Sequence, residues 1–306
     1  MMVSLETELC GLSLKSPTVL AAGILGCSPY SLKRVADCGA GAVTTKSIGP
    51  KKRDGHNNPT IVEVEGGYLN AVGLPTPGPD EGIKEIKEFK GLCETPIIAS
   101  FYASKLEEFA PLAEKISSAE PDILEVNISC PNVQNEFGIP FACEVGSAGA
   151  VVKSIKKSTS IPLLVKLSPN VPSIAIIGKA VEKASADGIV AINTVGPGMV
   201  IDLEARSPVL ANKRGGMSGP AIKPIAVRCI YDLFEAVDVP ILGVGGVLGG
   251  RDTAEMIMAG ASAVGIGTGI RYMGLDLFGL VAEELKEFMV NESFKSINEM
   301  RGCVHG

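Results

Sequence analysis

Polar side chains recur at the ends of four short apolar runs in this sequence. They form the pairs Lys46 and Ser47, Asn127 and Ser129, Lys166 and Ser168, and Asn193 and Thr194. Burying such groups without a partner costs roughly 1–3 kcal/mol each. We therefore expect two lysines and two asparagines to converge at one end of the fold, where the strands terminate. The alternative is that these residues cap strands and pair with carboxylates of nearby loops.

Cys130 is the best candidate for a proton acceptor. It directly follows one of these runs and precedes a proline, whereas the two histidines lie in a polar loop (His56) and beside the C-terminus (His305). A thiol has an ordinary pKa of about 8.5, so little lowering is needed for it to act near neutrality. The alternative, a buried structural cysteine, is the expectation for the other seven cysteines, at positions 10, 27, 38, 93, 143, 229 and 303. None of the eight is spaced as C-x-x-C, so we predict no metal site.

Two glycine-rich segments, GVGGV (243–247) and GIGTG (265–269), end the last two apolar runs. Glycine lets a backbone approach an anion closely. In (β/α)₈ barrels the loops after strands seven and eight frequently bind phosphate through backbone N–H groups. These segments therefore predict a phosphorylated ligand, either a substrate or a cofactor.

Eight apolar, β-branched runs alternate with amphipathic stretches such as 106–118 and 175–185. The runs span residues 18–23, 42–47, 96–102, 122–129, 162–168, 188–194, 240–246 and 263–268. Their nearly continuous apolar character is typical of parallel strands covered by helices. The pattern predicts an α/β fold, a (β/α)₈ TIM barrel forming one domain over residues 1–306, and a doubly wound open sheet is the alternative.

The chain before the first run predicts a small hairpin that closes the bottom of the barrel. Three long connections, 48–80, 130–146 and 195–220, follow strand ends and should therefore lie at the C-terminal face, where active sites of barrels are found. Two of them, 48–80 and 195–220, are rich in glycine and proline and are expected to be functional loops.

The composition argues against two classes of partner. The net charge is −6, and the short basic run at 51–53 lies beside Asp54, so no basic face for nucleic acid is expected. No apolar run approaches the ~20 residues that span a bilayer, and the N-terminus is too polar for a signal peptide. We expect a cytoplasmic protein that binds neither nucleic acid nor membrane.

Several segments together resemble the class 1 dihydroorotate dehydrogenases. The resemblance rests on NAVGL (70–74), NISCPN (127–132), INT (192–194), SGPAIKP (218–224), GVGGV (243–247) and MAGASAVGIGT (258–268), and it runs nearly end to end. The stretch DLEARSPVLANKRGGMSGPAIKP (202–224) is most similar to the type B subgroup. The resemblance implies oxidation of dihydroorotate to orotate with hydride transfer to FMN, in pyrimidine biosynthesis. It also implies a homodimeric core and a second subunit that carries FAD and an iron–sulfur cluster and uses NAD.

The resemblance assigns roles to individual residues. Cys130 would take a proton from dihydroorotate. The substrate would be held by Lys46, Asn70, Ala71, Val72, Gly73, Leu74, Asn127, Asn132, Asn193 and Thr194. FMN would be held by Ala22, Lys46, Ser47, Asn127, Lys166, Ile192, Gly219, Gly245, Gly246, Gly267 and Thr268. Lys166 would place its charge against the pyrimidine end of the flavin, where negative charge develops on reduction.

The sequence departs from the family pattern in three places. Relatives usually carry a serine at the position of Ala22 and many carry an asparagine near Ser100, while the loop after Cys130 is shorter than type B enzymes lead us to expect. Two alternative functions stay open. One is a dihydropyrimidine dehydrogenase acting on uracil or thymine, and the other is an aldolase in which Lys166 forms a Schiff base.

Overall fold

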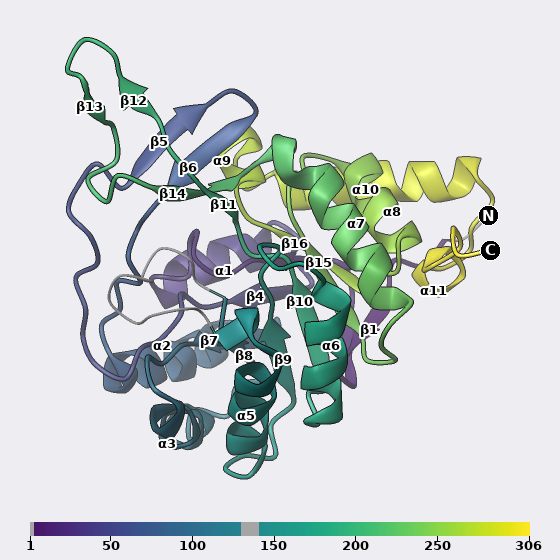
Figure 1. Ribbon diagram of the computed structural model, residues 1–306. Coiled ribbons are helices and arrows are strands. Elements are labelled where there is room, and N and C mark those ends of the chain that lie inside the picture. Colours follow the sequence, from purple (N-terminus) through teal and green to yellow (C-terminus); the bar gives the residue numbers. More distant parts are fainter. Residues whose placement is uncertain (1–2, 130–140) are drawn as a thin grey trace.

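Eight parallel strands form a closed barrel in the computed structural model, which describes residues 3–129 and 141–306 (Figure 1). The order around the barrel is β10-β15-β16-β3-β4-β7-β8-β9. The strands are β3 (Thr18–Leu20), β4 (Ala42–Thr44), β7 (Ile97–Phe101), β8 (Ile123–Asn127), β9 (Leu163–Lys166), β10 (Gly188–Ala191), β15 (Ile241–Val244) and β16 (Ala263–Ile266). Each coincides with one of the eight predicted runs, so the predicted (β/α)₈ barrel is confirmed.

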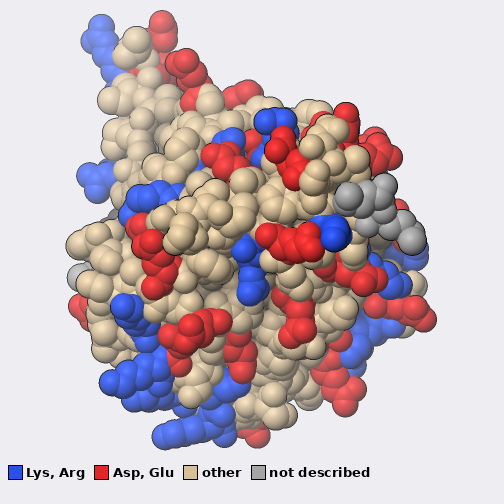
Figure 2. Space-filling view, turned by 90° about the vertical axis from the view of Figure 1, so that its right-hand side faces the viewer, with Lys and Arg blue, Asp and Glu red and all other residues tan. Residues whose placement is uncertain are grey.

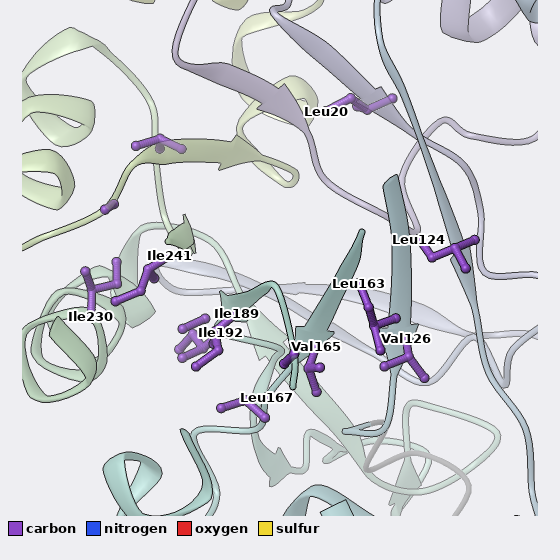
Figure 3. Close-up of a cluster of buried hydrophobic side chains, with 14 of the residues drawn as sticks. Leu20, Leu124, Val126, Leu163, Val165, Leu167, Ile189, Ile192, Ile230 and Ile241 are labelled. Carbon is purple, nitrogen blue, oxygen red and sulfur yellow. The ribbon is translucent and has the colours of Figure 1, made fainter. Parts of the chain in front are cut away.

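A helix follows each barrel strand and packs on the outside of the barrel. These helices are α1 (Pro29–Asp37), α2 (Pro79–Leu92), α3 (Leu106–Ser117), α5 (Val145–Lys156), α6 (Ile174–Lys183), α7 (Lys223–Phe234), α8 (Gly250–Met258) and α10 (Leu277–Asn291). Short helical turns are η2 (Phe141–Cys143), η3 (Pro220–Ile222), α9 (Gly269–Met273) and α11 (Ile297–Met300). Leu124, Val126, Leu163, Val165 and Ile189 belong to the buried layer between strands and helices, part of which is shown in Figure 3.

The N-terminal hairpin closes the bottom of the barrel, as predicted. Strands β1 (Thr7–Leu9) and β2 (Leu12–Leu14) pair antiparallel and bury Leu9 and Leu14 completely. These two leucines belong to an inner cluster to which every barrel strand contributes one residue: Val19, Ala42, Ile98, Ile123, Leu164, Val190, Leu242 and Ala263. The hairpin is therefore the floor on which the rest of the barrel interior is built.

The next inward-facing layer of the barrel is divided into a polar and an apolar half. Since side chains alternate along a strand, this layer lies two residues further along each strand. On β3, β10, β15 and β16 the positions are Ala21, Ile192, Val244 and Gly265. On the neighbouring strands β4, β7, β8 and β9 they are Thr44, Ser100, Glu125 and Lys166, all buried. Polar residues in such a buried layer need partners from the protein or from a ligand.

Two of the predicted long loops contain a second sheet. Strands β5 (Ile61–Val64) and β6 (Gly67–Asn70) come from 48–80, and β11 (Val195–Gly198) and β14 (Gly215–Ser218) come from 195–220. They form an antiparallel sheet in the order β11-β14-β6-β5, and a small hairpin of β12 (Ile201–Asp202) and β13 (Ser207–Pro208) projects beyond it (Figure 1). Both segments leave the C-terminal ends of barrel strands, so the sheet lies over that end of the barrel.

The two ends of the described chain lie side by side (Figure 1). Ser4 forms a parallel bridge with Ser296, and the final segment buries Ile297 and Met300 completely. Within the described ranges no helix has the length and apolar character needed to cross a membrane. On the face shown in Figure 2, acidic and basic side chains are interspersed.

Candidate active site

A cavity of about 250 Å³ lies at the C-terminal end of the barrel. Of the described residues predicted for substrate or FMN, all but one line it: Ala22, Lys46, Ser47, Asn70, Val72, Gly73, Leu74, Asn127, Lys166, Ile192, Asn193, Thr194, Gly219, Gly245, Gly246, Gly267 and Thr268. The exception is Ala71, which is fully buried and whose carbonyl is bound by His56 Nδ1 at 3.0 Å. Cys130 and Asn132 lie outside the described residues.

Lys166, the last residue of β9, brings a positive charge to this cavity. Its side chain is only 6% exposed, and it has neither a hydrogen bond nor an ion pair among the described residues. A buried ammonium group without a counter-charge is costly. A ligand that presents an anion or strong acceptors to Lys166 would offset that cost, so this end of the cavity fits a ring that carries acceptor atoms, or a carboxylate.

Asparagine amides and a serine form a connected group on the adjoining wall. Asn127 Oδ1 accepts from the backbone N and Oγ of Ser129, at 3.3 and 3.1 Å. Asn193 Nδ2 donates to Ser129 Oγ at 2.8 Å and reaches Asn127 Oδ1 at 3.5 Å, while its Oδ1 accepts from Thr194 N at 2.8 Å. The oxygen of Asn127 is thus engaged within the protein, whereas its amide nitrogen has no partner in the described ranges and can donate to a ligand.

The segment 70–74 presents backbone groups to the cavity. Gly73 and Leu74 both have positive φ, at 79° and 55°. Their carbonyls are held from behind, because Arg53 Nε donates to Gly73 O at 2.6 Å and Tyr102 Oη donates to Leu74 O at 2.9 Å. Their N–H groups have no partner in the part of the chain that the structure describes. Two adjacent N–H groups can bind an anion.

Gly73 must be glycine for this arrangement to exist. A Cβ there would lie 2.6 Å from the ring of His56 and 2.7 Å from its backbone nitrogen. His56 itself does not line the cavity and instead supports the segment from behind. The sequence had shown His56 only as a residue of a polar loop, and nothing in its spacing marked this role.

The glycines after β15 and β16 line the opposite part of the cavity. Gly245 and Gly246 have positive φ, at 148° and 78°, and Gly267 lies beside them. The backbone N–H groups of Gly245, Gly246, Gly267 and Thr268 form no hydrogen bond with any other described residue. A side chain at Gly246 would come within 2.9 Å of Gly219 O, whereas one at Gly267 would meet only Ala21 Cβ, at 3.7 Å. Exposed backbone donors, three of them on glycines that have no Cβ, form a surface suited to phosphate.

Several residues that line the cavity were not predicted. They include Arg271, Tyr68 and Ser218. Arg271 lies in α9, three residues beyond Thr268, and its guanidinium carbon is 5.4 Å from the centre of the Tyr68 ring. Ser218 Oγ accepts from Thr268 Oγ1 at 2.8 Å. Arg271 could have been found from the sequence, because a cation directly after a glycine-rich phosphate segment suits an anion, but Tyr68 comes from the unpredicted sheet.

No group of three or more His, Cys, Asp or Glu residues that could hold a metal ion occurs among the residues described. The donors that line the cavity are lysine, amide, hydroxyl and backbone groups. Such a set binds an organic ligand with several acceptors and an anionic group.

Comparison with known proteins places this geometry in a family context. The family model described as dihydroorotate dehydrogenase matches residues 4–289. A protein of Methanocaldococcus jannaschii described as "Dihydroorotate dehydrogenase B (NAD(+)), catalytic subunit" is 48% identical over 304 residues, 98% of each chain. Proteins with the same description from Methanothermobacter thermautotrophicus and Pyrococcus furiosus are 43% identical over 305 residues (100% of each chain) and 42% identical over 300 residues (98% of each chain).

Proposed function

This chain belongs to the dihydroorotate dehydrogenase family, and we propose that its cavity holds FMN and dihydroorotate together. The two ligands would lie between Lys166, the glycines after β15 and β16, and the hydrogen-bonded group of Asn127, Ser129 and Asn193, which we call the amide wall. The observation that carries this arrangement is the buried ammonium of Lys166, which has no partner among the described residues, in a cavity that is also lined by the backbone of glycines after β15 and β16. FMN has a pyrimidine ring with carbonyl and ring-nitrogen acceptors at one end, where negative charge develops on reduction, and a phosphate at the other, so the residues fit it. The family prediction made from the sequence is confirmed, and the two alternative functions are not favoured.

The glycine segments hold the phosphate in this proposal. The N–H groups of Gly245, Gly246, Gly267 and Thr268 are the donors, and Gly219 lets the chain of η3 pass close to them. Backbone donors bind an anion without the entropy loss of ordering a long side chain. Lys166 and Ser47 lie on the polar half of the barrel and contact the pyrimidine end. When bound, FMN supplies the hydride acceptor of the reaction.

Dihydroorotate is held by donors of two kinds. Asn127 offers its amide nitrogen to a ring carbonyl, with Asn193 fixing the orientation of Asn127 through Ser129. The adjacent N–H groups of Gly73 and Leu74 suit the substrate carboxylate, which uracil and thymine lack. Asn70 and Lys46 complete the described part of this wall.

Cys130 is the proposed base, which accepts a proton from a ring carbon of dihydroorotate. It follows Ser129, which is fully buried and bonded to both Asn127 and Asn193. The residue directly before Cys130 is therefore held in place by the asparagines proposed to bind the substrate.

An anaerobic titration tests this proposal. The purified chain should be yellow, and dihydroorotate should bleach the visible absorbance of its bound flavin, while dihydrouracil, which lacks the carboxylate, should leave it oxidised. Bleaching by both compounds at similar rates would remove the role assigned to Gly73 and Leu74. A colourless preparation that also fails to bind added FMN would contradict the cofactor site itself.

We further infer that this chain is the catalytic subunit of a two-subunit enzyme. The relatives quoted above are described as catalytic subunits of an NAD(+)-dependent enzyme, and the sequence offers no cysteine cluster for an iron–sulfur centre. A second subunit would supply FAD and an iron–sulfur cluster and would pass electrons to NAD. A homodimer of this chain would form the core of the assembly.

A further inference from the structure

A hydrogen-bonded chain runs from the barrel interior to the cavity wall on the polar half of the barrel. Ser47 Oγ lies 2.8 Å from Ser100 Oγ, and Ser100 Oγ donates to Glu125 Oε1 at 2.8 Å. Glu125 and Ser100 are almost completely buried, with 1% and 0% of their surface exposed, while Ser47 lines the cavity. Neither Ser100 nor Glu125 touches the cavity, and the mechanism above gives neither of them a role.

We propose that Glu125 is a positioning residue that acts through Ser100 to orient the Ser47 hydroxyl toward FMN. The inference rests on the proposed placement of the FMN pyrimidine ring against Ser47. A carboxylate only accepts hydrogen bonds, so the Ser100 proton points to Glu125. The Ser100 oxygen must then accept from Ser47, and the Ser47 proton is committed to the protein. Ser47 is left facing the cavity with its lone pairs.

This orientation matches the flavin pyrimidine ring, which carries an imide N–H between two carbonyls. An accepting Ser47 can bind the N–H, while Lys166 can only donate and therefore suits a carbonyl or ring-nitrogen acceptor. Ser47 and Lys166 together therefore bind one donor and one acceptor of the flavin ring. If Glu125 could not accept, the Ser47 hydroxyl would be free to donate, and this discrimination would be lost.

The position of Ser100 is fixed well enough for the chain to work. Its backbone N donates to Thr45 Oγ1 at 3.0 Å, and its carbonyl accepts from Ile48 N at 2.8 Å. These two bonds fix the backbone of Ser100, and its hydroxyl is held between Ser47 Oγ and Glu125 Oε1, each at 2.8 Å. Serine is short enough to stand between Ser47 and Glu125.

The carboxylate also sets the charge near the flavin. Glu125 and Lys166 occupy neighbouring strands of the same inward-facing layer, with Asn127 paired to Lys166 in the register of β8 and β9. No ion pair within 4 Å joins them in the described structure, so the Lys166 charge stays directed at the cavity. Removing the Glu125 charge would leave Lys166 less opposed and make the flavin easier to reduce.

Four single variants, Ser47→Ala, Ser100→Ala, Glu125→Gln and the control Ser16→Ala, test the proposal together with the double variant of Ser47 and Ser100. Ser16 is also a buried serine bonded to another hydroxyl, that of Thr18 at 3.0 Å, but it lies at the bottom of the barrel. The measurements are the FMN dissociation constant from flavin fluorescence, the reduction potential of bound FMN by dye equilibration, and the melting temperature of the FMN-free chain.

We expect Ser47→Ala and Ser100→Ala each to weaken FMN binding by about 2- to 10-fold, the range for a typical net hydrogen bond. The double variant should be no weaker than the worse single variant, because both act through one chain. Glu125→Gln should raise the reduction potential, Ser100→Ala should shift it less, and Ser16→Ala should change neither binding nor potential. If Glu125→Gln does not fold, additive losses in the cycle of Ser47→Ala and Ser100→Ala would still overturn the proposal, because the chain from Glu125 to the cavity would then be broken at its second link.

The outcomes separate this inference from the proposed function. Loss of FMN affinity in Ser47→Ala, with wild-type affinity and potential in Ser100→Ala and Glu125→Gln, would overturn the role of Glu125 and keep Ser47 at the flavin. Additive losses in the double variant would also overturn it. Wild-type FMN affinity in Ser47→Ala itself would instead refute the proposed placement of FMN.

Discussion

Two neighbouring glycines of the proposed phosphate site should respond in opposite ways to the same substitution. Gly246 has φ of +78°, and a Cβ there would lie 2.8 Å from Lys223 Cβ and 2.9 Å from Gly219 O. Gly267 has no positive φ, and its Cβ would meet only Ala21 Cβ, at an ordinary 3.7 Å. Gly246→Ala therefore disturbs the protein fold, whereas Gly267→Ala adds a methyl group that the fold accepts but a closely bound phosphate does not.

The magnitudes follow from these contacts. A non-glycine residue in the left-handed region costs roughly 1–2 kcal/mol, which lowers the melting temperature by about 2–8 °C in a domain of this size, and the contact with Gly219 O adds to that. Gly267→Ala should leave the FMN-free melting temperature unchanged. Losing one backbone hydrogen bond to a charged phosphate, worth about 1.5–3 kcal/mol, should weaken FMN binding by about 10- to 100-fold.

Thermal unfolding of the FMN-free chain and fluorescence titration with FMN measure the two effects separately. Gly91→Ala is the matched control, because Gly91 lies exposed in α2 with nothing within 4 Å of its Cβ position. It should retain FMN affinity and gain slightly in stability, since alanine favours helix by about 1 kcal/mol. Wild-type FMN affinity in Gly267→Ala would show that the phosphate does not approach this backbone. Wild-type stability in Gly246→Ala would refute the steric reasoning.

Four further predictions concern the site, the partner subunit and the N-terminal hairpin. Cys130→Ala should retain FMN and bind orotate but reduce its flavin with dihydroorotate about 10²–10⁴-fold more slowly, and Cys130→Ser should recover as pH rises; rapid reduction in the alanine variant, in stopped-flow traces, would leave the base unidentified. Asn193→Ala should weaken orotate binding by about 1–3 kcal/mol, measured by titration calorimetry, because Asn193 also orients Asn127; unchanged affinity would contradict the amide wall. The isolated chain should reduce an artificial acceptor but NAD poorly in steady-state assays, and efficient NAD reduction without a partner would refute the two-subunit proposal. Burial, with Asp187 nearby, raises the pKa of Cys10 to about 12. Iodoacetamide at pH 8 should therefore label the exposed Cys27 and leave Cys10 unmodified, as measured by mass spectrometry of the peptides. Equal labelling of the two cysteines would show that the N-terminal hairpin opens.

The barrel was predictable because its strands are buried on both sides. Each run, such as the one that contains β9, is nearly continuously apolar until its last residues, where polar side chains appear. In a parallel barrel all strands end at the same face, so Lys166, Asn127 and Asn193 had to meet there whatever the helices between them did. The cavity could therefore be placed by topology alone, without any knowledge of side-chain contacts.

The antiparallel sheet over the barrel could not be predicted, because its strands lack the apolar pattern that identified the barrel strands. Its strands are rich in glycine, which usually indicates a loop. Here the glycines serve close approach: a Cβ at Gly67 would lie 2.0 Å from Ser218 O, one at Gly215 would lie 2.6 Å from Asn70 O, and one at Gly216 would lie 2.0 Å from Thr194 Oγ1. The glycines locally favour a loop, whereas the packing of the folded chain requires them within strands. The paired strands β6 and β14 also lie about 150 residues apart in the chain, so no local pattern indicates their pairing.

Ser100, near which many relatives carry an asparagine, is a residue whose role only the structure explains. From the sequence, a serine in place of the asparagine of many relatives was only an irregularity. In the structure Ser100 occupies the same inward-facing layer as Glu125 and Lys166, and its hydroxyl joins Glu125 to Ser47. Ser100 is paired directly with Glu125 in the register of β7 and β8, and paired residues face the same side of a sheet, so the strand pairing explains why this serine is the centre of a buried polar chain. These contacts explain why half of this layer is polar. Ser100 and Glu125 extend hydrogen bonds from the barrel interior to Ser47 at the cavity, and Lys166 places a positive charge at the edge where the flavin ring is proposed to lie.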